Sequence, residues 1–150
     1  MTLPPVFRRA GLGAAEGVAA TAVMTAVFGA GQATGLLRTP PPERVVEEAA
    51  DNLDTDPPRP PAKGLIVWLA HFGFGAVMGA AFRVLRPNPR APILEGVGFG
   101  LAEWAVSYLV ALPAARLFPP AHRDQLGRQA VNVAAHSVFG ATLGITARRG

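Results

Sequence analysis

Three side chains with acid–base chemistry fall inside apolar stretches of the sequence: His71, Glu103 and His136. Each histidine is followed four residues later by a glycine, Gly75 or Gly140. In a helix this spacing leaves open space beside the imidazole on the same face. Ionisable groups within apolar segments are costly, and they tend to serve a function. We therefore expect Glu103 and the two histidines to form a small polar centre.

The chemistry of the two histidines has three interpretations. Each imidazole can hydrogen-bond a neighbouring helix and fix the packing. The pair can instead belong to a path for protons or small solutes. As the main alternative, two matched histidines can ligate the iron of haem b from both sides, as in b-type haem or pigment-binding proteins. Otherwise no cofactor is expected.

Known catalytic signatures are missing from the sequence. It has no nucleophile elbow, phosphate loop, dinucleotide fingerprint or metal-ligand spacing, and it has no cysteine. The sequence therefore predicts a non-enzymatic protein with no bound metal, apart from iron in the haem alternative.

Four apolar stretches must position these groups. They cover residues 11–37, 64–82, 93–115 and 129–147. Each approaches the roughly 20 residues that a helix needs to cross a bilayer. Only 16% of the 150 residues are charged, against about 25% in soluble domains. The sequence predicts an all-α membrane protein with four transmembrane helices in a single domain, 1–150.

An internal repeat relates the two halves of the chain. The pattern A-H-x-x-F-G-A-x-x-G-x-x-x-R occurs at 70–83 and again at 135–148. This predicts a duplication, with one unit at 11–85 and the other at 91–148. Because two crossings return the chain to its starting side, the two helical hairpins are expected to be parallel, related by a pseudo-two-fold axis along the membrane normal.

The repeat also pairs charged residues near the helix ends. Glu16 and Glu95 each begin the sequence E-G-V at the entry of a span, whereas Arg83 and Arg148 lie at the exit of the following span. Within each unit we expect the carboxylate to lie beside the guanidinium, so that each satisfies the charge of the other. These ion pairs are predicted to be structural.

Glycines spaced four residues apart recur in the spans. In the second and fourth spans they are Gly75, Gly79, Gly140 and Gly144. Such small-xxx-small spacing allows two helix backbones to approach closely in lipid. We expect these four glycines to lie at helix contacts.

The segment between the first two spans, 38–63, is polar and rich in proline. Within it Val45, Val46, Ala49 and Leu53 recur at helical spacing. The pattern predicts a short amphipathic helix at the membrane interface, followed by a proline-stiffened tether. Its role is expected to be connection.

The basic residues lie at the ends of the apolar stretches. The chain has 14 Lys and Arg and a net charge of +4. This distribution is typical of membrane flanks and argues against nucleic acid as a partner. The expected partners are the lipid bilayer and a second copy or a larger membrane complex. Each side of the membrane would carry seven basic residues, but those around the termini are closer to the helix ends. We therefore expect cytoplasmic termini.

Taken together, the layout resembles that of YagU-type small bacterial inner-membrane proteins. The shared features are a Gly-rich first span, the Pro-Pro that follows it, and the H-x-x-x-G steps of the second and fourth spans. The resemblance implies four spans in a bacterial inner membrane and brings no catalytic residues. The expected function is passage of protons or small solutes, or stabilisation of a membrane complex.

Overall fold

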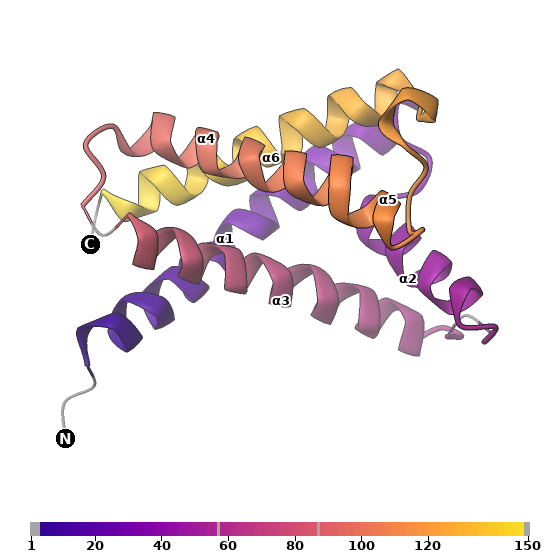
Figure 1. The fold of residues 1–150 in the computed structure, drawn as a ribbon, viewed down its shortest axis with the longest axis horizontal. Coiled ribbons are helices and arrows are strands. Elements are labelled where there is room, and N and C mark those ends of the chain that lie inside the picture. The colour runs from indigo at the N-terminus through magenta and orange to yellow at the C-terminus, as the bar shows by residue number, and fades with distance from the viewer. Residues whose placement is uncertain (1–3, 57, 87, 149–150) are drawn as a thin grey trace.

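The computed structural model describes residues 4–56, 58–86 and 88–148, and within them the chain is helical without strands (Figure 1). Helices alone can span lipid with every backbone group paired inside one segment. The elements in chain order are α1 (Pro5–Ala33), α2 (Pro41–Asn52), α3 (Ala62–Leu85), α4 (Pro92–Trp104), the π-helix η1 (Ala105–Ala111), α5 (Leu112–Ala114), the 3₁₀ turn η2 (Ala121–Arg123) and α6 (Leu126–Ala147).

Four helical stretches of the described chain are long and apolar enough to cross a membrane. They are α1, α3, α6 and the continuous run α4–η1–α5, Pro92–Ala114. The four predicted spans and the all-α membrane fold are confirmed. Several helices begin a few residues earlier than predicted. In α1 and α4 the first helical residue is a proline, Pro5 or Pro92, which suits this position because its N–H would have no partner there anyway.

The helices pack in two pairs, α1 on α3 and α4 on α6, and the pairs meet where α6 packs on α1 (Figure 1). Glycines lie at both contacts. A Cβ added at Gly17 would collide with the carbonyl oxygen of Gly75, and one added at Gly96 would collide with that of Gly140. The backbones therefore approach as closely as the spacing of four predicted.

The two pairs use the same register. Gly17 and Gly96 are equivalent positions of the repeat, and so are Gly75 and Gly140. One turn away Gly79 faces Gly13, while its equivalent Gly144 faces Pro92, the counterpart of Gly13. Matching contacts of this kind support the proposed duplication, which stays a prediction.

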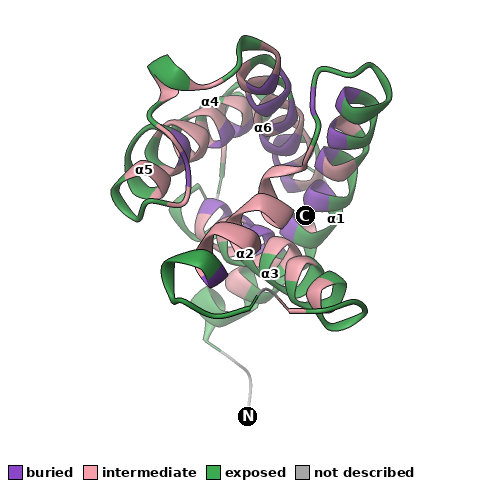
Figure 2. Cartoon of the chain, turned by 90° about the vertical axis from the view of Figure 1, so that its right-hand side faces the viewer, coloured by how far each residue is buried: buried purple, intermediate pink, exposed green. Residues whose placement is uncertain are grey.

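The outer surface of the bundle is apolar. Figure 2 shows buried residues on the inward faces of the helices and exposed ones around them. Large exposed side chains include Trp68, Leu69, Val77 and Leu94, with 54–75% of their surface accessible. A soluble monomer rarely exposes so much contiguous apolar surface, whereas lipid is a favourable solvent for it.

α2 lies across one end of the bundle beside α3. Lys63, at the start of α3, donates hydrogen bonds to Glu43 (2.9 Å) and Glu47 (2.5 Å) on α2. The guanidinium of Arg44 lies 5.0 Å from the centre of the Phe118 ring. The short helix lies where it was predicted, and α2 contacts two other parts of the chain; its expected role as a connection stays a prediction.

We expect Lys63→Met to loosen α2 without unfolding the bundle, because it removes both bonds between α2 and α3. Hydrogen exchange of the α2 amides should rise several-fold, while exchange in α1 and α6 stays unchanged. Lys63→Arg, which keeps the charge, is the matched control. Unchanged protection of α2 in Lys63→Met would show that these ion pairs do not hold the helix.

The third span contains a feature that the sequence analysis missed, the π-helix η1. Pro113 has no N–H to donate to the preceding turn, so an ordinary α-helical bond is lost there. The amide of Leu112 instead bonds the carbonyl of Ser107, five residues back. π-Helical segments often mark functional sites, and this one begins two residues after Glu103.

Candidate functional site

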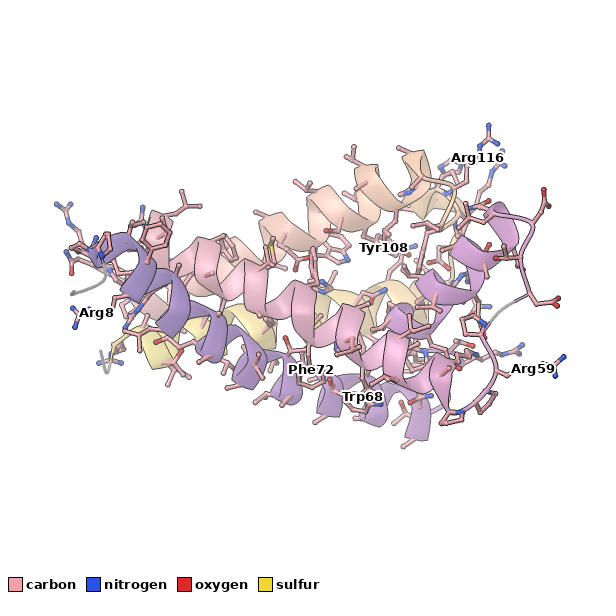
Figure 3. All side chains as sticks on the ribbon, turned by 90° about the horizontal axis from the view of Figure 1, so that it is seen from below. Arg8, Arg59, Trp68, Phe72, Tyr108 and Arg116 are labelled. Atoms are coloured by element: carbon pink, nitrogen blue, oxygen red, sulfur yellow. The ribbon has the colours of Figure 1, made fainter. Side chains whose placement is uncertain are left out.

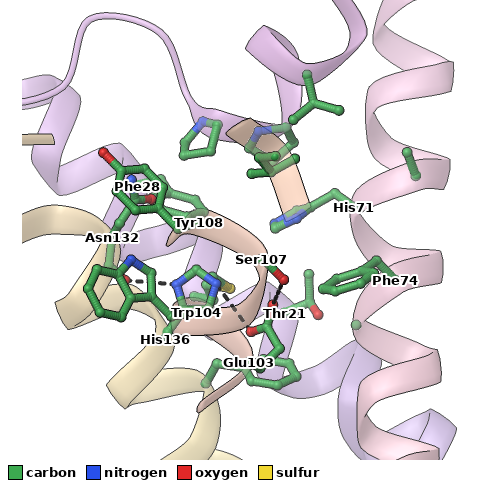
Figure 4. A pocket seen from close by; sticks show the side chains of 18 of the residues that line it. Thr21, Phe28, His71, Phe74, Glu103, Trp104, Ser107, Tyr108, Asn132 and His136 are labelled. Carbon is green, nitrogen blue, oxygen red and sulfur yellow. Dashed lines mark hydrogen bonds and ion pairs between the residues drawn. The ribbon is translucent and has the colours of Figure 1, made fainter. Parts of the chain in front are cut away.

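A cavity of about 390 Å³ lies inside the bundle, walled by α1, α3, α6 and the α4–η1 run, with α2 at one end (Figure 4). Most of its wall is apolar, with Met24, Phe28, Phe74 and Phe139 among the lining residues. A concave, mainly apolar site with a few polar groups is the usual form of a small-molecule site. The polar groups therefore decide what this cavity can bind.

Glu103 and His136 form an ion-pair contact in the cavity wall. Oε2 of Glu103 lies 3.2 Å from Nε2 of His136, and the two side chains are only 7% and 14% exposed. Ser107, one turn along in η1, donates to the other carboxyl oxygen at 3.2 Å. The pair therefore lies deep in the fold, with both carboxyl oxygens occupied (Figure 4).

The backbone fixes the tautomer of His136. Its Nδ1 lies 2.8 Å from the carbonyl oxygen of Asn132, which can only accept, so Nδ1 carries a proton. The remaining contact, Nε2 to Glu103, then needs one more proton. That proton lies either on the imidazole, giving a charged pair, or on the carboxyl, giving a neutral one. In both forms the pair has no net charge, which lowers the cost of placing it in a membrane.

His71 lies on another wall of the cavity and does not join this pair. Its Nε2 is 3.1 Å from the hydroxyl oxygen of Thr25. That hydroxyl already donates its proton to the carbonyl of Thr21, at 2.8 Å. Nε2 of His71 must therefore be the donor, and its lone pair is not available there.

The haem alternative stays a prediction, and the hydrogen bonds of the two rings show what ligation would require. An axial histidine offers a ring nitrogen lone pair to the iron. His71 uses Nε2 as a donor to Thr25, while His136 uses Nδ1 toward Asn132 and Nε2 toward Glu103. Ligation by His136 through Nε2 would displace Glu103 but keep the Nδ1 bond to Asn132, which is of a kind that metal-bound histidines commonly make, and His71 retains a lone pair on Nδ1.

Two buried N–H groups beside the pair have no hydrogen-bond partner among the described residues. They are Nε1 of Trp104 and Nδ2 of Asn132, and both residues line the cavity. Asn132 is only 2% exposed. A buried donor without an acceptor costs about 1–3 kcal/mol. Both atoms are covered by the surrounding chain, so a ligand in the cavity reaches them only if these side chains turn.

A second layer of contacts holds η1 in place. The hydroxyl of Tyr108 donates to Asp124, whose other carboxyl oxygen is 2.7 Å from Nη1 of Arg128. The ring of Tyr108 stacks on Trp104, with centroids 5.7 Å apart, and meets Phe118 edge-on at 5.9 Å. The position of Trp104 in the cavity wall therefore depends on the loop before α6.

The structure places the predicted ion-pair residues differently in the two halves. Nη2 of Arg83 lies 3.4 Å from Glu16, and its Nη1 donates to the carbonyl of Ala147 at 2.9 Å. The expected pairing of Glu95 with Arg148 is corrected, because Glu95 instead binds Arg86. The carboxylate of Glu95 also accepts from the backbone of the turn that precedes α4, at 2.9 and 3.1 Å, which turns it toward Arg86. Arg148 is exposed.

Several residues of the site escaped the sequence analysis. Ser107 has a local signal, since it follows Glu103 by four residues, and Arg128 follows Asp124 in the same way. Thr25 has none, because it meets His71 only through the packing of α1 on α3. Asn132 and Trp104 were visible as polar groups within spans, but only the folded chain brings both into the lining of one cavity.

The fold and its apolar surface define a multi-pass, all-helical membrane protein with a polar pair in its interior. The chain belongs to a family of unknown function, DUF6789, whose model matches residues 7–149. Comparison with curated proteins and with solved structures gave no match. The resemblance to YagU-type proteins is not tested by this family match and stays a prediction.

Proposed function

We propose that this protein binds a small, mainly apolar molecule bearing carbonyl-type acceptors inside the membrane, next to a proton shared by Glu103 and His136. The observation that carries the proposal is the buried carboxyl–imidazole pair in the lining of one apolar cavity, with the polar side chains of Trp104 and Asn132 beside it. This is a non-enzymatic role in handling a small solute, within the range expected from the sequence.

The cavity supplies the two parts of such recognition. Its aromatic and aliphatic walls suit an apolar body, and burial of that body provides most of the binding free energy. On binding, the N–H groups of Trp104 and Asn132 turn toward its acceptor atoms, each new hydrogen bond adding about 0.5–1.5 kcal/mol. The lining therefore favours a ring or short chain with one or two carbonyl oxygens over a pure hydrocarbon.

The Glu103–His136 pair adds a proton that can respond to the ligand. An acceptor near the pair would favour the form with the proton on His136, because that form places positive charge on the imidazole, while the Asn132 carbonyl holds the ring in place. Binding or release of solute and proton would then be linked. The pair lies roughly 14–18 Å from the nearer helix ends, at about 1.5 Å per residue, so the exchange would occur within the membrane.

We further propose a bacterial inner membrane with both termini in the cytoplasm. Arg8, Arg9, Arg86 and Arg90 lie close to helix ends on the terminal side, where positive charge has most influence on orientation. A protease-accessibility assay on sealed inverted vesicles tests this. Cleavage of a tag at the C-terminus is expected in inverted vesicles and not in right-side-out ones.

The binding proposal is tested with two probes of the same ring size, a methylated naphthoquinone and methylnaphthalene. They differ in the two carbonyls. The chain has two tryptophans, so Trp68→Phe leaves Trp104 as the only tryptophan, in the cavity wall. Quinone binding is followed by quenching of Trp104, and the hydrocarbon by its competition with the quinone. We expect the quinone to bind roughly tenfold tighter or more, from two added hydrogen bonds.

Asn132→Leu, made in the Trp68→Phe background, supplies the decisive comparison. It removes a buried donor that has no partner, so stability should stay the same or rise. The quinone should nevertheless lose most of its advantage over methylnaphthalene. Equal affinity of the two probes for the unaltered cavity, or an advantage that survives in Asn132→Leu, would contradict the proposed recognition.

A further inference from the structure

A second concave site lies at the opposite end of the bundle from α2. It is a depression of about 680 Å³ between the start of α1, the ends of α3 and α6, and the turn before α4. Figure 3 shows Arg8 at this end, with Arg59 and Arg116 at the other. The depression therefore lies where the spans leave the membrane, away from the cavity of Glu103 and His136.

Arginine dominates the lining of this depression. Arg8, Arg9, Arg83, Arg90 and Arg148 all contribute, and no carboxylate is among the described lining residues. Among these five, Arg83 has its charge partner in Glu16. The other four lining arginines come from three separate parts of the chain, and together they give the depression a positive potential.

Arg83 is held in a fixed position within the site. Its side chain is 7% exposed and is held by Glu16 and by the carbonyl of Ala147, which ties the end of α3 to the end of α6. The other four arginines of the lining are exposed. Guanidinium groups bind phosphate oxygens in pairs of parallel hydrogen bonds, so an arginine-lined depression is suited to a phosphate.

We propose that this depression binds the phosphate of an anionic phospholipid headgroup. Two observations favour a lipid over a phosphate from solution. The site lies at the ends of membrane-spanning helices, where headgroups are concentrated. Leu12 is part of its lining and is 48% exposed, so apolar surface continues from the charged site onto the flank of α1. Basic pockets between spans recognise anionic lipids by this combination.

The test uses purified protein in micelles of a neutral detergent, titrated with phosphatidylglycerol or phosphatidylcholine while the thermal midpoint is recorded. A ligand that binds only the folded state raises this midpoint. We expect phosphatidylglycerol to raise it and phosphatidylcholine to have little effect. In Arg8→Gln/Arg90→Gln/Arg148→Gln, the apparent affinity for phosphatidylglycerol should fall at least about tenfold. Arg83 is left intact because it is structural.

A matched variant separates a site from general attraction. Arg59→Gln/Arg116→Gln/Arg123→Gln removes the same charge from exposed arginines at the other end of the bundle. It should keep the response to phosphatidylglycerol. An equal loss in both triple variants would overturn the site, since net charge alone would then explain binding. Inorganic phosphate that reproduces the full shift without lipid would overturn the lipid assignment.

Discussion

Gly140→Ala should destabilise this protein strongly, although alanine is normally the better helix former. The new Cβ would collide with the carbonyl oxygen of Gly96 and would lie 3.0 Å from Cα of Val97. Both are backbone atoms, so α4 and α6 would have to separate. Overpacking of this kind costs about 1–3 kcal/mol, and the loss of neighbouring close contacts places the expected effect at the upper end. Unfolding of the purified protein in mixed micelles measures it.

Gly98→Ala is the matched control for this prediction. Gly98 lies on the same helix pair, but a Cβ there meets nothing within 4 Å. This variant should be neutral, or stabilised by up to about 1 kcal/mol through helix propensity. Gly17→Ala, at the equivalent contact of α1 with α3, should behave like Gly140→Ala. Similar effects at positions 98 and 140 would show that the close helix approach is not what stabilises the fold.

Glu103→Leu should have the second large effect. It leaves Nε2 of His136 without its partner in an apolar cavity and removes the acceptor of Ser107. Leaving buried polar groups unpaired costs about 1–3 kcal/mol each, so a loss of roughly 2–4 kcal/mol in unfolding free energy is expected. The same variant should abolish any linkage between ligand binding and pH.

Two further variants complete this prediction as a double-mutant cycle. In Glu103→Leu/His136→Leu both partners are apolar, so much of the lost stability should return. Glu103→Gln keeps the shape and the hydrogen-bonding capacity, and should fold normally without a proton to share. If the double variant loses as much unfolding free energy as the two single variants lose together, Glu103 and His136 do not interact.

The overall fold could be predicted from the sequence because lipid imposes simple requirements on a spanning segment. Length and hydropathy predicted four spans, and spacing of four placed glycines such as Gly75 and Gly140 at close contacts. The π-helix could not be predicted this way. It lies just before Pro113, which lacks an N–H, and its Tyr108 bonds Asp124 in a later loop, a contact that spacing along the helix does not reveal.

The candidate site could be predicted only in part. Glu103 and His136 were expected in one polar centre and lie together in the structure, whereas His71 binds Thr25 on a different wall. Periodicity indicates which residues share a helix face, but not the rotation of one helix pair against another. That rotation decides which of two histidines meets the carboxyl. It also decides that Glu95 reaches Arg86 and not Arg148.

The central claim is that Glu103 and His136 share a proton in a membrane cavity, with Nδ1 of His136 held by Asn132. Nitrogen NMR of histidine-labelled protein in lipid bilayers tests it most directly, with His136→Gln identifying the signal. We predict a proton on Nδ1 at every pH at which the protein is folded, and an Nε2 signal that changes in Glu103→Gln. An imidazole with a bare Nδ1, or an Nε2 signal unaffected by Glu103→Gln, would contradict the claim.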